Sequence, residues 1–404
     1  MAVYLSPPGM LCCAGQNRTQ CFDAAAKGDQ GGIRPILLEG DRRFLAGRIQ
    51  EELPAAAADF GAEPAAYTAY TRIIRIADAA LEQIRGDVDR ALARYSPDRI
   101  GVCVGSCDNG SESSFSAHKA HLTAGIFPQD YALRFQSAGY TADFISGKFG
   151  LAGPALTVST ACASSAGAII KGAELIRTGL CDAVIAGGVD VASPTALLGF
   201  NALEAVSAAV TNPFSKNRKG ITLGEGACFF MLGKDKTARK IALLGAGESA
   251  DAFHITAPRP DGSGAVQAMR QALARAGIEP DEVDYLNLHG TGTPLNDRME
   301  ALALAAVFPR YTRRPQVSST KPITGHTLGA AGALELALCW MTLDAASQGK
   351  TAVPVHCWDG VYDRGLPKLR FAEPGARMEK PRICMSNSFA FGGCNVSLII
   401  GIQE

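Results

Sequence analysis

The chain has 404 residues, of which 47% are hydrophobic and 19% charged, and its formal net charge at pH 7 is zero. This composition argues against a disordered protein and against a nucleic-acid-binding protein, which would carry a basic excess. A chain of this length can build a core large enough to enclose a substrate.

The first residues, MAVYLSPPGMLCCAG, carry no basic segment, and Pro7 and Pro8 interrupt their short apolar run. We therefore expect no signal peptide, no membrane span and a cytoplasmic location, where cysteines stay reduced. The twelve cysteines show neither C-x-x-C spacing nor the pairing with histidine that is typical of zinc sites. We expect neither a disulfide framework nor a bound metal.

Strand-like runs that end near glycine alternate with helical patterns along the chain. The expected strands lie at residues 99–105, 155–160, 182–188, 227–233, 283–290, 315–320 and 395–401, and the clearest helices at 78–95 and 264–277. This alternation predicts an α/β protein whose strands are largely buried.

Two pairs of segments resemble each other at nearly the same separation. The passages VST…AGAIIKGAEL and VSST…AGALELALCW each place an AGA triplet in a helix, at residues 166 and 331. GEGACFFMLGK and FGGCNVSLIIG likewise each place a closing strand after a glycine-rich turn. The common separation indicates an internal duplication with halves 1–240 and 241–404, the alternative being a chance likeness of glycine-rich turns.

Cys162 follows the expected strand at 155–160 and opens a helix rich in small residues. The dipole and free N–H groups of a helix start favour a thiolate, and they offer up to about 2 kcal/mol. Lowering a thiol pKa by two units needs roughly 2.7 kcal/mol. We therefore expect a buried nucleophile whose pKa is lowered with help from a histidine, the alternative being a packing cysteine, as expected for the others.

Two histidines lie in glycine-rich turns that follow expected strands. His289 stands in NLHGTGTPLNDRME and His326 in STKPITGHTLGAAGALE. Ligands of α/β proteins bind at this edge of the sheet, so both are candidates for one site with Cys162, although a lone histidine in a turn is usually structural. His118 and His121 have helical spacing without a suitable carboxylate nearby, so we interpret them as part of a surface helix rather than a metal site.

Four motifs, TACASSAGA, HGTGTPLND, KPITGHTLGAAGALE and NSFAFGGCN, occur in this order along the chain. They resemble the β-ketoacyl-[acyl carrier protein] synthases, decarboxylating condensing enzymes of the thiolase superfamily, from about residue 99 to the C-terminus. The resemblance implies a thiolase-like fold, with two duplicated βαβαβαββ halves in a layered α-β-α-β-α arrangement. It also implies a decarboxylative Claisen condensation without a bound cofactor, because the substrates are carried on the phosphopantetheine arm of an acyl carrier protein.

The resemblance also implies roles for the matching residues. Cys162 corresponds to the nucleophile that accepts the acyl chain. His289 and His326 correspond to the pair that binds the malonyl thioester and assists decarboxylation. Lys321 and Glu335 correspond to the residues that orient this pair. Loss of CO2 leaves an enolate, which N–H groups of two neutral imidazoles would stabilise.

Further implied positions surround these groups. Phe391 corresponds to a gate beside the thiol, and its backbone N–H would join that of Cys162 in an oxyanion hole. Thr291 and Thr293 correspond to hydroxyls that contact the phosphopantetheine arm. Asp297 and Glu300 would support His289 from behind.

The sequence departs from the family pattern at a few places. Ser215 and Lys219, in PFSKNRKG, replace two acids, while Ala390 and Cys394 replace a glycine and a threonine. These changes leave the implied catalytic residues in place and bear on the gate loop and the carrier contacts. Residues 105–145 match least well, and the family uses that region for its dimer contact and the far end of its acyl pocket.

The resemblance leaves the pathway open. One reading is an elongating synthase of fatty acid or polyketide-type chains, and the other is a ketosynthase of specialised metabolism that acts on aryl polyene or polyketide intermediates. A noncatalytic partner subunit is disfavoured because all the implied catalytic residues are present, and a degradative thiolase because two histidines with a lysine suit decarboxylation. The expected partners are an acyl carrier protein and a second subunit, either another copy or a chain-length-factor-like homologue.

Overall fold

The computed structural model describes residues 1–38, 42–53, 71–108, 110–129, 131–236, 240–310 and 315–403. Its main sheet follows the strand order β12-β11-β13-β14-β10-β1-β9-β7-β5-β6, and β2 pairs with β9 beside this path. The strands nearer the N-terminus are β1 (Val3–Leu5), β2 (Gly9–Cys12), β5 (Ile100–Gly105), β6 (Ala155–Val158), β7 (Ala183–Asp190) and β9 (Gly226–Gly233). The others are β10 (Ile241–Ala250), β11 (Tyr285–Asn287), β12 (Gln316–Ser318), β13 (Ile383–Phe389) and β14 (Cys394–Ile402).

The two ends of this path repeat one pattern of strand directions. β5 runs parallel to β6 and β7, and β7 runs antiparallel to β9, which runs antiparallel to β1. β11 likewise runs parallel to β12 and β13, and β13 runs antiparallel to β14, which runs antiparallel to β10. The repeat confirms the predicted duplication. We propose the boundary near residue 240, in the connection between β9 and β10.

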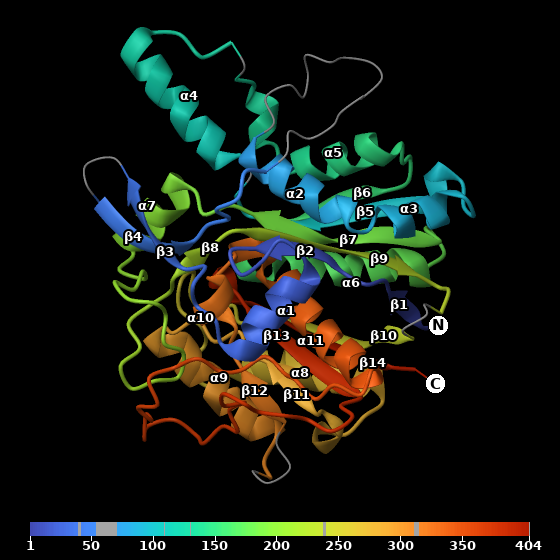
Figure 1. Ribbon diagram of the computed structural model, residues 1–404, viewed down its shortest axis with the longest axis vertical. Helices are drawn as coiled ribbons and strands as arrows, with labels where there is room; N and C mark the ends of the chain where they lie inside the picture. The colour runs from blue at the N-terminus through green and yellow to red at the C-terminus, as the bar shows by residue number, and fades with distance from the viewer. Residues whose placement is uncertain are drawn as a thin grey trace.

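Helices form layers between and outside the two groups of strands (Figure 1). α6 (Ser164–Arg177) packs on β5 and β7, α11 (Ala331–Ser347) packs on β13, and the two helices contact each other in the middle layer. α2 (Arg72–Glu82) and α5 (Tyr140–Phe149) cover one outer face, and α8 (Ser263–Ala276) covers the other with α9 (Pro294–Val307) packed against it. The remaining helices are α1 (Arg18–Lys27), α3 (Arg85–Leu92), α4 (Ser111–Ala124), α7 (Pro194–Ala202) and α10 (Lys321–Thr324).

The middle helices approach their neighbours closely because small residues line them. A Cβ added at Gly105 would lie 2.2 Å from the backbone nitrogen of Ser165, and one at Gly332 would lie 2.8 Å from the Cβ of Ala166. Neither space admits a side chain. The small residues that follow Cys162 therefore place the start of α6 deep against the sheet, as predicted.

The stretch Leu328–Ser347 is long and apolar enough to cross a membrane by length and composition, and its most apolar 18 residues are all buried, while Ser347 at its end is exposed. It contains α11, which packs between the two groups of strands, so its all-round hydrophobicity reflects burial on every side. The stretch is therefore a core segment of this fold.

All seven predicted strands are present, and the helix predicted at 264–277 corresponds to α8. The helix predicted at 78–95 was wrong, because α2 ends at Glu82 and a separate helix, α3, begins at Arg85. The break falls at Ile84, whose φ of −108° and ψ of 6° depart from helical values. Next to it, the side-chain amide of Gln83 accepts a hydrogen bond from the backbone N–H of Met10 and donates to the Met10 carbonyl, both at 3.2 Å, which ties this point of the chain to β2.

Candidate active site

Cys162 lies in a short 3₁₀ turn, Ala161–Ala163, between the end of β6 and the start of α6. Ala161 has a φ of 49°, in the left-handed region that is unfavourable for a residue with a Cβ. The hydroxyl of Ser164 stabilises the turn, because it accepts from the N–H of Thr160 at 2.9 Å and donates to the carbonyl of Ala161 at 2.6 Å. The turn presents the thiol of Cys162 in a buried position.

His326 lies directly beside this thiol. Its Nε2 is 3.0 Å from the sulfur of Cys162. The backbone of His326 is held on both sides, since its N–H donates to the carbonyl of Thr222 at 2.7 Å and its carbonyl accepts from Gly224 at 2.9 Å. Gly224 belongs to β8 (Leu223–Gly224), which forms a small sheet with β3 (Arg34–Leu38) and β4 (Arg42–Gly47). This small sheet therefore fixes the position of the histidine.

His289 completes the group from the end of β11. The centroids of the His289 and His326 rings are 5.4 Å apart with nearly perpendicular planes. Glu300 of α9 accepts hydrogen bonds from the backbone N–H groups of His289 at 2.8 Å and of Gly290 at 2.7 Å, which fixes the turn. Burial raises the pKa of Glu300 to about 8, and the two N–H groups oppose that rise.

Lys321 and Glu335 form a buried ion pair behind His289. The ammonium of Lys321 donates to Glu335 and to the backbone carbonyl of His289, and it lies 3.5 Å from Nδ1 of His289. An ammonium can only donate, so its approach to Nδ1 favours the tautomer with the proton on Nε2. Burial and the charge of Lys321 lower the pKa of both His289 and His326 well below the usual value, so both rings are neutral near pH 7.

The expectation of a lowered thiol pKa was wrong. Burial raises the pKa of Cys162 to about 12, and neither the Lys321 charge nor the Phe391 N–H offsets it. The cause is that α6 and its turn are packed deep in the protein, where a charged sulfur loses its water. The resting pair is therefore a neutral thiol beside a neutral His326, whose Nε2 can accept the proton when the sulfur attacks.

The pH dependence of alkylation checks this protonation state. With a pKa near 12, the thiolate fraction of Cys162 rises tenfold per pH unit throughout the neutral range. In His326→Ala, where no imidazole can take the proton during attack, we expect the rate of Cys162 modification by iodoacetamide, followed by peptide mass, to rise about tenfold per unit from pH 7 to pH 9. A rate that is already constant above pH 7 in this variant would show that the sulfur rests as a thiolate.

The Cys162 sulfur, which has His326 beside it, is also close to the backbone N–H of Phe391. The N–H of Phe391 lies within hydrogen-bonding reach of the Cys162 sulfur, in the turn that joins β13 to β14. The ring of Phe391 packs on Phe200 with centroids 5.7 Å apart, and Phe200 lies in α7, which Ser193 caps by accepting from the N–H of Ala196 at 3.1 Å. The predicted partners of the oxyanion hole and the gate are thus adjacent to the thiol.

One cavity of about 380 Å³ contains the thiol and both histidines. Thr291 and Thr293 line its wall, and their hydroxyl oxygens are 3.0 Å apart. Leu203 and Leu295 line its outer part, where 56% and 60% of their surfaces are exposed. The cavity therefore leads from the protein surface past the threonine hydroxyls to Cys162.

Asp297 has a different place from the one predicted. Its carboxylate accepts from the N–H of Phe214 at 2.7 Å and of Gly292 at 3.1 Å, so it holds the turn that carries Thr291 rather than His289 itself. Burial raises the pKa of Asp297 to about 6. Of Glu300 and Asp297, therefore, only Glu300 hydrogen-bonds to the backbone of His289.

Asp190 also supports the site, although no motif in the sequence indicates it. It ends β7, and its carboxylate accepts from the hydroxyl of Ser106 at 2.8 Å, from the N–H of Asp108 at 2.8 Å and from the N–H of Gly329. Gly329 lies three residues after His326, so Asp190 fixes the far side of the histidine turn. Its position just after the strand predicted at 182–188 is the sequence feature that could have indicated this role.

The departures in PFSKNRKG have a structural account. Ser215 is fully buried, and its hydroxyl donates to Asp359 at 2.7 Å, while Arg218 donates to Asp363 at 2.6 Å. Asp359 and Asp363 therefore lie next to the loop in which Ser215 and Lys219 replace the acidic residues of the family pattern. Lys219 is exposed at the outer part of the cavity.

The trio Cys162, His289 and His326 offers ligand atoms that lie within 4.8 Å of one another, a spacing that a metal ion could use. The ammonium of Lys321, 3.5 Å from Nδ1 of His289, opposes a second cation there. His118 and His121 lie in α4, where the ring of His121 stacks on Phe127 at 4.3 Å, consistent with the predicted surface helix.

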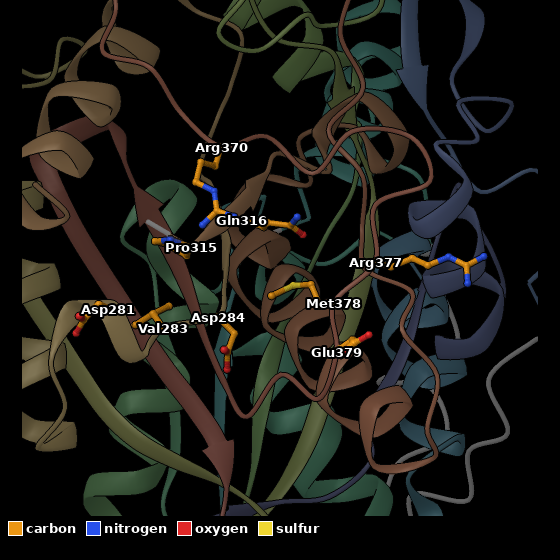
Figure 2. A pocket seen from close by; sticks show the side chains of 9 residues that line it. All are labelled: Asp281, Val283, Asp284, Pro315, Gln316, Arg370, Arg377, Met378 and Glu379. Atoms are coloured by element: carbon orange, nitrogen blue, oxygen red, sulfur yellow. The ribbon is translucent and has the colours of Figure 1, made fainter. Parts of the chain in front are cut away.

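A second cavity, of about 490 Å³, lies at the start of β12, and the described residues that line it include neither a cysteine nor a histidine. Figure 2 shows its acidic and basic side chains, among them Asp281, Arg370 and Arg377, spread around the space rather than converging on one point. This arrangement offers no nucleophile, so the chemistry is assigned to the cavity of Cys162.

Comparisons with known proteins agree with this geometry. Residues 37–238 match the family model "Beta-ketoacyl synthase, N-terminal domain", and residues 241–352 match "Beta-ketoacyl synthase, C-terminal domain". A 3-oxoacyl-[acyl-carrier-protein] synthase 2 of Coxiella burnetii is 32% identical over 420 residues, and Nodulation protein E of Rhizobium meliloti is 32% identical over 406 residues. Each alignment covers 98% of both chains.

Solved structures are similar over the full length. The ketosynthase ApeO in complex with its chain length factor ApeC, from Xenorhabdus doucetiae, has 38% identity and a TM-score of 0.91, covering 100% of this chain and 98% of that one. The ishigamide ketosynthase/chain length factor has 27% identity and a TM-score of 0.86, covering 100% and 99%.

Proposed function

Because the chain belongs to the β-ketoacyl synthase family and is a decarboxylating 3-oxoacyl-carrier-protein synthase, we propose catalytic roles for three of its residues and a partner subunit with which it works. Cys162 is the nucleophile, His326 its proton acceptor, and His289 the hydrogen-bond donor to the malonyl thioester. The observation that carries this assignment is the 3.0 Å contact between the Cys162 sulfur and Nε2 of His326, at the base of a cavity shared with His289.

In the loading step, the sulfur of Cys162 bonds to the carbonyl carbon of the acyl thioester while its proton passes to Nε2 of His326. The N–H groups of Cys162 and Phe391 stabilise the negative oxygen that forms. The bond from carbon to the sulfur of the carrier arm then breaks, and the departing thiolate takes the proton from His326. The neutral thiol needs this acceptor, because burial keeps its pKa near 12.

In the condensation step, the malonyl thioester oxygen accepts a hydrogen bond from Nε2 of His289. The bond to the carboxylate breaks, CO2 leaves, and its electron pair forms an enolate that the neutral ring stabilises without a full positive charge. The enolate carbon bonds to the acyl carbon on Cys162, the sulfur leaves, and one proton from solvent restores the thiol. Thr291 and Thr293 hold the arm by hydrogen bonds. No bound cofactor takes part in these steps.

We further propose that the chain works beside a chain-length-factor-like homologue in specialised metabolism, on aryl polyene or polyketide-type intermediates. Support comes from the 38% identity to a ketosynthase solved in complex with its chain length factor. The surface agrees with this assembly. α4 projects from the body of the protein (Figure 1), and Leu122, Ile126 and Leu133 in and after it are 86%, 71% and 74% exposed. β6 pairs only with β5 among the described strands, so it offers a free edge.

Association and elongation measured together test this proposal. Purified with the chain-length-factor homologue of its source organism, the protein should sediment as a one-to-one complex and extend malonyl groups on an acyl carrier protein. Leu122→Glu should weaken the complex at least tenfold, because it places a charge in an apolar contact, whereas Leu37→Glu, at a 62% exposed position in β3, should not. A stable monomer with full elongation activity would contradict the assembly.

A further inference from the structure

The outer part of the active-site cavity carries one described cation. The charged residues that line the cavity are Glu204, Lys219 and Asp251. Asp251 is buried and already accepts from the side chain of Asn395 at 2.8 Å and from the N–H of Arg259 at 2.9 Å. Glu204 and Lys219 are exposed, so they are the charges that an incoming substrate meets first.

The backbone around Lys219 is fixed on both sides against the turn of Thr291 and Thr293. Before it, the guanidinium of Arg218 donates to the carbonyl of Pro294 at 3.4 Å. After it, the N–H of Gly220 donates to the carbonyl of Gly292 at 2.9 Å. The backbone at Lys219 is therefore held next to the turn of Thr291 and Thr293, and its exposed side chain lies nearer the surface than their hydroxyls.

A third contact strengthens this placement. The hydroxyl of Thr211 lies 2.9 Å from the carbonyl of Gly220 and 2.8 Å from the carbonyl of Thr291, so it bridges the two loops. Lys219 itself forms no ion pair with any residue in the described part of the chain. Its ammonium is thus available to a ligand at the cavity mouth.

We propose that Lys219 binds the phosphodiester of the carrier-bound arm as the arm enters the cavity. The inference rests on the proposed function, because the arm must pass Thr291 and Thr293 to bring its thioester to Cys162. The phosphodiester lies at the carrier end of the arm and bears one negative charge, which an exposed ammonium complements. The lysine replaces an acid of the family pattern, so this contact is a property of this chain. Lys219 is a positioning residue, since it touches the arm far from the reacting atoms.

Two small thioesters separate this contact from all others. Acyl-phosphopantetheine carries the phosphate, acyl-pantetheine lacks it, and neither brings a carrier protein. We expect Lys219→Ala to lower the preference for the phosphorylated thioester, measured as the ratio of the two kcat/KM values for loading, about five- to tenfold. Lys219→Glu should lower it further, and Lys219→Arg should restore it. Lys216→Ala is the matched control, because Lys216 is exposed in the same loop but does not line the cavity.

The outcomes are distinguishable. An unchanged ratio in Lys219→Ala would overturn the inference. If that variant instead weakens loading only from the intact acyl carrier protein, the lysine contacts the carrier's acidic surface and the phosphate assignment is wrong. If the unaltered protein loads from neither thioester nor carrier, the failure lies in the proposed function itself.

Discussion

A Cys162→Ala variant is expected to lose acyl loading and to fall at least about 10⁴-fold in condensation rate, because no other cysteine among the described residues lines the active-site cavity. The alanine fits the same space, so the fold should be retained. Intact mass after incubation with an acyl carrier thioester measures loading, and release of β-ketoacyl product measures condensation.

Cys357→Ala is the matched control, since Cys357 is a partly buried thiol that lies outside the lining of the active-site cavity. It should load and condense at rates close to those of the unaltered protein. An acyl adduct that forms at another cysteine of Cys162→Ala, with product still released, would show that the nucleophile is misassigned.

The two histidines should fail in different ways. His289→Ala removes a donor to the malonyl oxygen, so condensation should fall about 10²- to 10³-fold while loading changes only a few-fold. His326→Ala removes the group 3.0 Å from the sulfur, so it should slow loading as well as condensation. Single-turnover loading followed by a chase with malonyl carrier protein separates the two steps.

Asparagine at each position sharpens the comparison. Its side-chain N–H groups can donate to an oxygen, but it accepts a proton far less well than imidazole. His289→Asn should therefore recover part of the condensation rate, whereas His326→Asn should remain slow in loading. Equal loading rates in the His289 and His326 variants would contradict the separate roles.

The sequence predicted the site well because its residues lie in short motifs at the ends of strands. His289, His326 and Cys162 were placed together from three glycine- or alanine-rich turns, and the duplicated fold explains why those turns meet. The ends of β6, β11 and the segment after β12 converge on one cavity. The local sequence motifs were therefore enough to predict that these three residues share one site.

What the sequence could not give depends on distant contacts. The pKa of Cys162 rises because the whole middle layer buries it, which no motif records. The break between α2 and α3 falls at Ile84, beside the hydrogen bonds between Gln83 and Met10, and Asp359 meets Ser215 across a separation of 144 residues. The amended role of Asp297 likewise follows from its contact with Phe214.

Mass analysis of the enzyme, first loaded with an acyl group and then chased with malonyl carrier protein, shows whether Cys162 carries the growing chain. The protein, with its partner subunit, is incubated with acyl carrier thioesters that bear saturated, aromatic or polyunsaturated chains, and the adduct is located by peptide mass. We expect one acyl group on the peptide that contains Cys162, which disappears on addition of malonyl carrier protein with one CO2 per β-ketoacyl product. An adduct on another residue, or product formed while the Cys162 adduct persists, would contradict it.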